Sequence, residues 1–412
     1  MTMVQRRRTD LSAAAGWALS LTLVGYPVAG LIGSAFDWDS TAASVPFRVG
    51  VLVFSVVLLV RSPASGIWLR KASWLKVFTL LYLLRLLWDL GVAGVPGAGG
   101  ALAFFLITVL LPCMALACVA GELREEQCAQ ATAILGGTVC FMAVVMYAMD
   151  WGLHRSLTEQ TRRLSFEAVN PITLGHTAVT TVIAALVLAR RPIGSLRIAL
   201  VFAAIVVALS CLVLSASRGP LLALGVCALG YVLFASNWRM RLLLLGLGVL
   251  IGLLTLSNLG DGSELLLRFT DLDEDDSSLE RLLLQSNAIN QFLASPWLGS
   301  AYCELEFLEY PHNLFIETAM ALGVVGLMVM SVLVYLAGVQ FVRRIRDGET
   351  LLPLLLLQYL VAIQFSGSLW GANAFWAMMA VTLAGKLRPQ ASPMRRRAMR
   401  SEQVLVALTA IK

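Results

Sequence analysis

The sequence predicts an all-α polytopic membrane protein with about twelve transmembrane helices and both termini in the cytoplasm. Its composition is 58% hydrophobic and only 14% charged, and its mean hydropathy is +0.81. Soluble chains carry about 45–50% apolar and about 25% charged residues. A soluble fold could not cover this much apolar surface, and a disordered chain has the opposite composition.

The apolar residues fall into segments long enough to span a bilayer, which takes roughly 20 helical residues. Twelve such segments are expected, at 11–35, 45–60, 74–95, 101–120, 130–151, 171–189, 198–215, 220–236, 242–258, 313–341, 351–366 and 369–386. The chain is therefore expected to divide into spans one to nine (1–258), an external loop with an amphipathic helix (259–312), spans ten to twelve (313–386) and a basic cytoplasmic tail (387–412).

Basic residues predict the orientation of these spans. Clusters lie at Arg6–Arg8, Arg61–Lys76, Arg190–Arg197, Arg239–Arg241, Arg343–Arg346 and Lys386–Arg400. With twelve spans and the N-terminus inside, every cluster lies on the cytoplasmic side, as the positive-inside rule requires. The net charge of +6 is thus a topogenic signal and does not indicate nucleic-acid binding.

Cysteine, histidine and acidic residues give little support for a metal site. Cys303 is the single cysteine expected outside, and no Cys/His spacing resembles zinc ligands. The acidic run 271–276 contains an Asp-x-Asp pair, which could hold a divalent ion or could simply be a solvated stretch before a helix. We expect no metal and no cofactor.

Two arginines are expected within spans, Arg48 and Arg85. Arg85 lies four residues before Asp89, so the two side chains share one helix face. The pair could be a self-neutralising ion pair or part of a proton or ion relay, because charged groups in a bilayer are costly and often functional. The first alternative is favoured.

The long external loop is expected to contain an amphipathic helix. Ser277 to Glu280 has the pattern of a capping box, and Ser295-Pro296 would end the helix. We expect this helix to lie along the outer membrane surface, with Arg281 near the lipid headgroups.

Three inward-running spans are each expected to begin at a proline on the external side: Asn170-Pro171, Gly219-Pro220 and Pro311-His312. Helix N-termini present unsatisfied N–H groups and partial positive charge, so they attract anions. Arg163 and Arg218 would add planar forks suited to phosphate, although arginines at span ends can also simply extend to the headgroups.

His312 is expected in the first helical turn, where the helix dipole favours a neutral imidazole that can accept a proton. It could instead only cap the helix. His176, about one turn inside its span, is interpreted first as a hydrogen-bonded interhelical residue.

Several of these segments resemble the O-antigen ligase and O-antigen polymerase superfamily. The resemblance rests on Ser215–Pro220, on Ser295–Gly299, on Pro311–Glu317 with Leu322–Leu327, and on Arg163 followed by Asn170-Pro171. The single motifs are short, and their order and the long loop between them make the likeness specific.

The resemblance implies a membrane glycosyltransferase (GT-C-like) fold with its active site on the periplasmic face of the bacterial inner membrane. The donor would be a glycan on undecaprenyl diphosphate, the acceptor the lipid A–core oligosaccharide, and the other partners membrane lipids. His312 would be the general base and Arg218 would stabilise the leaving diphosphate, in a metal-independent inverting displacement. The further residues expected at the site are the diphosphate-binding Arg163, Arg281 and Arg268 and the supporting Asn313, Asn170 and His176.

Ligase activity is preferred over repeat-unit polymerase activity, because the chain has one dominant external loop and its other loop, 152–170, is modest. A transporter of lipid-linked glycans is the third alternative. It is disfavoured because no internal repeat is evident and charges other than Arg85 and Asp89 lie at the membrane rims.

Overall fold

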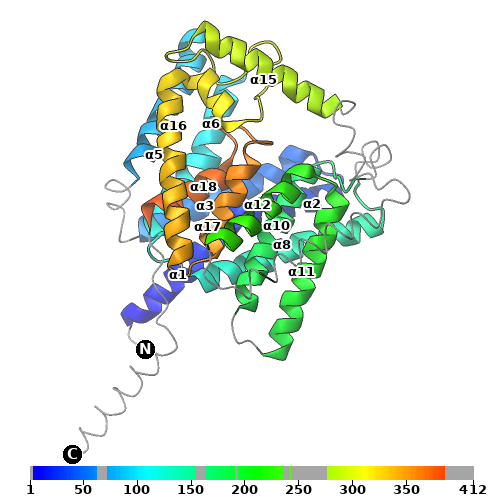
Figure 1. Cartoon of the computed structure of the whole chain (residues 1–412). Helices are drawn as coiled ribbons and strands as arrows, with labels where there is room; N and C mark the ends of the chain where they lie inside the picture. Colours follow the sequence, from blue (N-terminus) through cyan, green and yellow to red (C-terminus); the bar gives the residue numbers. More distant parts are fainter. Residues whose placement is uncertain are drawn as a thin grey trace, which may run out of the picture.

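The computed structural model describes residues 3–62, 72–153, 163–190, 194–234, 242 and 276–385, and these form a bundle of helices (Figure 1). The first half comprises α1 (Met3–Val24), α2 (Tyr26–Ala35), α3 (Ser40–Arg61), α5 (Ser73–Trp88), η1 (Asp89–Ala93), α6 (Ala98–Phe104), η2 (Phe105–Leu110), α7 (Leu111–Val119) and α8 (Glu125–Ala148). The second half comprises α10 (Pro171–Ala189), α11 (Ser195–Ser215), α12 (Arg218–Phe234), α15 (Asp276–Ala294), α16 (Leu314–Arg346), α17 (Leu351–Ala362) and α18 (Asn373–Ala384).

Within the described ranges, six helices are long and apolar enough to cross a membrane: Thr41–Arg61, Ala98–Val119, Glu125–Ala148, Pro171–Ala189, Ser195–Ser215 and Leu314–Arg346. A seventh results if α1 and α2, bent by 56° at their junction, are one span. The chain is thus an all-helical, multi-pass membrane protein in its described part. The expectation of twelve spans and the topology built on it are not confirmed.

Helix length explains the difference. The segments expected at 351–366 and 369–386 form α17 and α18, which have 12 residues each. At 1.5 Å per residue such a helix is about 18 Å long, short of the roughly 30 Å hydrocarbon core. Apolar composition therefore identified these segments, but composition does not reveal where the helix stops. Of the segment expected at 242–258, residues 243–258 lie outside the described residues.

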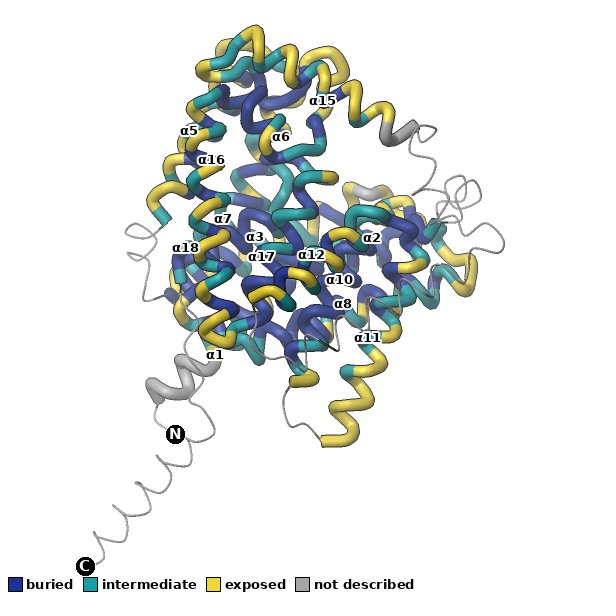
Figure 2. Tube along the Cα trace, in the orientation of Figure 1, coloured by how far each residue is buried: buried dark blue, intermediate teal, exposed yellow. Residues whose placement is uncertain are grey.

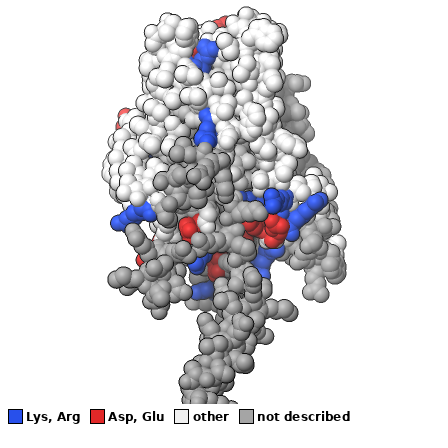
Figure 3. Space-filling model, turned by 90° about the vertical axis from the view of Figure 1, so that its left-hand side faces the viewer, with Lys and Arg blue, Asp and Glu red and all other residues white. Residues whose placement is uncertain are grey.

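Different helices form the interior and the outer surface of the bundle. The centre is occupied by α10, most of whose side chains are buried (Figure 2), and it packs against α8, α11, α12 and α17. By contrast, α11 exposes a row of large apolar residues, Leu196, Ile198, Leu200 and Phe202. On the face shown in Figure 3, charged side chains gather in one band below a mostly uncharged surface. Such an exposed apolar surface suits contact with lipid.

A sharp break in α16 joins this helix to the loop before it. Gly323 has φ 63° and ψ −158°, outside the helical region, and Gly299 in the loop has φ 73°. A methyl group on Gly323 would lie 2.4 Å from the Trp297 carbonyl oxygen, and one on Gly299 2.4 Å from the Ala321 carbonyl carbon. Both positions therefore require glycine, because the backbones touch and φ is positive.

The break leaves backbone groups of α16 without helical partners, and the loop supplies them. The Val324 N–H donates to the Pro296 carbonyl at 2.8 Å, and the Ser300 N–H donates to the Met320 carbonyl at 2.9 Å. The motif at 295–299 and the Leu-Gly at 322–323 are thus two halves of one packed unit, which fixes where the loop continues towards His312.

Candidate functional site

The Ser215–Pro220 motif forms the tight turn between α11 and α12. Ala216 ends α11 with φ 43° in the left-handed region, and the Ser217 hydroxyl donates to the Ser215 carbonyl at 3.1 Å. Helix α12 begins at Arg218. The start expected at Pro220 is thus two residues late, and Arg218 itself lies in the first turn of the helix, where partial positive charge accumulates.

Arg163 lies across the end of α11. Its Nε donates to the Ser215 carbonyl at 3.3 Å and its Nη2 to the Ser217 hydroxyl at 3.0 Å. The neighbouring Leu164 N–H donates to the Leu214 carbonyl at 2.9 Å. The last carbonyls of a helix lack internal partners and carry partial negative charge, which explains the attraction. Arg163 thereby binds the residue next to Arg218.

The start expected at Asn170-Pro171 is confirmed. Pro171 is the first residue of α10, and the Asn170 side chain caps the helix by accepting the Thr173 N–H at 2.8 Å. Asn170 is exposed and lies on the wall of a cavity, described below.

His312 does not lie in a helical turn, in contrast to our expectation. Helix α16 begins at Leu314, and Asn313 is its cap, accepting the Phe315 and Ile316 N–H groups at 3.0 and 3.1 Å. His312 precedes the cap with φ 53°. A left-handed non-glycine residue is uncommon and is often found at functional sites.

The surroundings of His312 keep its imidazole neutral. Its pKa is lowered to about 4, first by burial and then by the positive charge of Arg281. The main cause of the lowered pKa is burial, and not the helix dipole that the sequence suggested. The ring lies against Tyr310, with 4.4 Å between ring centroids. Its Nδ1 is buried and has no hydrogen-bond partner among the described residues.

Arg281 reaches this region from α15, the helix expected in the long loop. Leu284 and Ala288 of α15 are buried, and the helix packs on α16. Other apolar residues of the same helix, such as Leu279, Leu283 and Leu293, are exposed. Arg268 and the acidic residues 271–275 lie outside the described residues.

The loop between α17 and α18 brings the separate motifs together. A methyl group on Gly219, next to Arg218, would lie 3.8 Å from Phe365 Cβ. Trp370, further along the same loop, contacts Tyr310 edge to face, with 6.2 Å between centroids. Gly219, next to Arg218, thus lies close to this loop, and Tyr310, two residues before His312, contacts it.

Two buried side chains hold that loop in place. Glu317 in α16 is fully buried, and its Oε1 accepts the Leu369 N–H at 2.8 Å. The indole N–H of Trp376 donates to the Leu369 carbonyl at 2.8 Å. Glu317 thus positions Trp370 through the neighbouring residue Leu369. Sequence reasoning missed this role, although a carboxylate in an apolar span is a signal for function.

His176 is buried in α10, and neither of its ring nitrogens has a hydrogen-bond partner in the described part of the chain. The interpretation as a hydrogen-bonded interhelical residue is therefore wrong for its side chain. Only its carbonyl is bonded, to Gln358 Nε2 at 2.9 Å and to the Thr180 hydroxyl at 2.9 Å. A methyl group on Gly219 would lie 4.0 Å from His176 Nε2, so this ring is a close neighbour of the α12 start.

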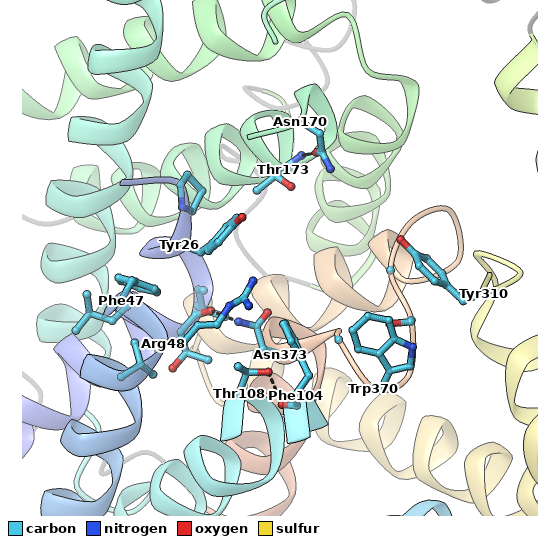
Figure 4. A pocket seen from close by; sticks show the side chains of 18 residues that line it. Tyr26, Phe47, Arg48, Phe104, Thr108, Asn170, Thr173, Tyr310, Trp370 and Asn373 are labelled. Atoms are coloured by element: carbon cyan, nitrogen blue, oxygen red, sulfur yellow. Dashed lines mark hydrogen bonds between the residues drawn. The ribbon is translucent and has the colours of Figure 1, made fainter. Parts of the chain in front are cut away.

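A cavity of about 430 Å³ opens where these elements meet (Figure 4). It joins Asn170 on one side with Tyr310 and Trp370 on another, and Arg48 of α3 extends into it (Figure 4). The remaining polar lining residues are Thr22, Tyr26, Thr108, Thr173, Ser368 and Asn373. Sequence reasoning placed Arg48 within a span and gave it no role.

The Arg85–Asp89 pair proves to be a clamp on the loop before His312. Arg85 Nη1 pairs with Asp89 Oδ1 at 3.3 Å, and its Nη2 donates to the Leu298 carbonyl at 2.7 Å. Asp89 Oδ2 accepts the Tyr302 N–H at 2.8 Å. The pair therefore does more than neutralise itself: it fastens residues 298–302 to α5 and η1.

No group of three or more His, Cys, Asp or Glu side chains that could hold a metal is found in the described part of the chain. The cysteines at 113, 118, 128, 140, 211, 227 and 303 are free and buried.

Together these features define a class: a multi-pass helical membrane protein with a partly polar cavity that contains Arg48 and is lined by Tyr310, the ring neighbour of His312. Residues 203–331 match the family described as O-antigen ligase. Members of this family are glycosyltransferase-like enzymes. The matched residues contain Arg218, Arg281 and His312 but not Arg163, Asn170 or Arg48. No curated protein matches the chain.

Proposed function

We propose that the protein is an O-antigen ligase of the bacterial inner membrane. It transfers a glycan from undecaprenyl diphosphate to the lipid A–core oligosaccharide on the periplasmic side, and lipid substrates reach the site sideways from the bilayer. One observation carries the proposal: the α12 start with Arg218 and the turn with His312 are far apart in sequence, yet both lie beside the loop 363–372, which Gly219 approaches and Tyr310 contacts.

The proposed cationic corner consists of Arg163 and Arg218. A departing diphosphate needs its charge neutralised, and two guanidinium forks beside a helix N-terminus supply positive charge and N–H donors. Arg281, whose charge acts on His312, extends this field. In this proposal the arginines replace the divalent ion that many sugar transferases use, so transfer continues in the presence of EDTA.

His312 is the proposed general base. An acceptor hydroxyl gives its proton to the imidazole while its oxygen bonds to the anomeric carbon of the donor sugar. The bond from that carbon to the diphosphate oxygen breaks, and the electron pair leaves with the diphosphate. A single displacement inverts the anomeric configuration. A pKa of about 4 describes the unliganded site, and a bound diphosphate raises it because the anion stabilises the imidazolium.

The experiment that tests the proposal is reconstitution of the full chain in vesicles with a lipid-diphosphate glycan. One sample contains lipid A–core as acceptor and another only further lipid-linked repeats. A single addition to lipid A–core, unchanged by EDTA, is expected. A ladder of products without lipid A–core would instead identify a repeat-unit polymerase, and glycan movement across the bilayer without transfer would identify a transporter.

A further inference from the structure

The 430 Å³ cavity contains a positive charge that the proposed mechanism does not use. Arg48 lies in α3, within an apolar helix, and its guanidinium carbon is 4.6 Å from the centroid of the Phe104 ring and 5.7 Å from that of Tyr26. No carboxylate of the described residues forms an ion pair with it. A charged group in an apolar span is costly and implies a function.

The rest of the lining suits a hydroxyl-rich anion. None of the lining residues is acidic, so Arg48 gives the cavity a net positive charge. Asn170, Asn373 and the hydroxyl groups of Thr22, Thr108 and Ser368 offer hydrogen-bond donors and acceptors. Sugars combine such polar edges with apolar C–H faces, which aromatic rings can cover. A volume of about 430 Å³ is within the range of small-ligand sites.

The position of the cavity indicates which substrate it receives. Tyr310 lines the cavity and lies against His312, the proposed base, which acts on the acceptor hydroxyl. Arg163 and Arg218, proposed for the donor diphosphate, are not among the lining residues. The cavity thus lies on the acceptor side of His312.

We propose that Arg48 binds a phosphate or carboxylate group on the saccharide acceptor and so selects anionic acceptors. The assignment of this group to the acceptor rests on the proposed transferase function. Binding of an anionic sugar to Arg48 in the cavity does not depend on that function. Arginine suits the task because its planar fork donates two parallel hydrogen bonds to either group.

The first test measures binding without catalysis. The full-length protein in nanodiscs of zwitterionic lipid is titrated calorimetrically with a hexose phosphate and with the same hexose lacking phosphate. The wild type is expected to prefer the phosphate by roughly 10- to 100-fold, the size of a charge-assisted hydrogen bond. Arg48→Gln should lose the preference, Arg48→Lys should retain part of it, and the control Arg61→Gln, at the other end of α3, should keep it fully. Equal binding of both sugars by the wild type would overturn the anion site.

The second test measures transfer kinetics with one substrate varied at a time. Arg48→Gln should raise KM for the phosphorylated acceptor by roughly 10- to 100-fold and leave KM for the donor unchanged. With a phosphatase-treated acceptor, wild type and variant should have the same KM. A rise in the donor KM, or an equal rise with the dephosphorylated acceptor, would overturn the acceptor assignment.

A lipid headgroup also carries a phosphate group that an arginine can bind. Repeating the titration in nanodiscs with anionic phosphatidylglycerol distinguishes binding of the sugar phosphate from binding of the lipid. If Arg48 binds lipid, the anionic lipid will abolish sugar phosphate binding, which contradicts the proposal. If the wild type binds the sugar phosphate but transfers no glycan, the proposed function fails while the anion site stands.

Discussion

Two arginines lie within apolar helices of this protein, and their surroundings differ completely. Arg85 is paired with Asp89 and donates to the carbonyls of residues 298–300, so it fastens a loop to α5. Arg48 is flanked by aromatic rings and extends into a cavity. In sequence both lie in apolar segments, and only Arg85 has an acidic residue one helical turn away. The difference teaches that an intramembrane charge whose partners are protein groups has a structural role, whereas one directed into a cavity is available to a ligand.

This comparison separates residues whose loss reduces stability from residues whose loss reduces activity. The largest effect is expected for His312→Ala, because a positioned general base contributes about 10²- to 10⁴-fold. Initial transfer rates in vesicles should fall by that factor, while the thermal midpoint in detergent stays within a few degrees of the wild type. Normal transfer by this variant would eliminate His312 as the base.

Asp89→Ala should show the opposite pattern. Asp89 is fully buried, and its removal leaves Arg85 without its counter-charge, which typically costs about 3–5 kcal/mol. Thermal unfolding should therefore shift to clearly lower temperature. Arg48→Gln, the matched control, removes no ion pair of the described residues and should unfold as the wild type does; equal destabilisation by both variants would contradict the distinction between the two arginines.

Arg218→Lys tests whether the cationic corner needs a fork or only a charge. Lysine keeps the charge but cannot donate two parallel hydrogen bonds to a phosphate. We expect transfer to fall by roughly 10- to 100-fold, with the fold retained in size-exclusion chromatography. A wild-type rate would indicate that Arg218 only contacts lipid headgroups.

The smallest effect is expected on pH dependence. Because the pKa of His312 is lowered to about 4, the free enzyme keeps a neutral base down to that pH, and kcat/KM should fall only below it. The charge of Arg281 contributes to the lowering, so Arg281→Gln should move the acidic limb of the kcat/KM profile to higher pH. A limb that stays in place would show that Arg281 does not act on the base.

One of the three expected helix starts at the site is confirmed, and the roles expected of the site residues stay predictions. Asn170-Pro171 begins a helix as expected, because proline and an asparagine cap act through adjacent residues. Pro220 and Pro311 misled the other two assignments, since Arg218 already begins α12 and Asn313 caps α16. Proline at the first helical position is a preference, and neighbouring residues can take over that position.

The larger omissions arose from contacts distant in sequence. Arg48 and Asn170 line one cavity although 122 residues separate them, and Glu317 holds Leu369 across 52 residues. Charge within an apolar segment could have drawn attention to Arg48 and Glu317. Nothing in the local pattern could have shown that the loop between α17 and α18 joins them to the motifs.

The sequence by itself determined the helical class, the apolar spans and the helix start at Asn170-Pro171, because composition, hydropathy and capping act over a few consecutive residues. Only the tertiary structure decided how long each helix is, where α16 breaks, and which arginine is fastened and which extends into the cavity. Those outcomes depend on close packing and hydrogen bonds between segments far apart in the chain, and no local pattern records them.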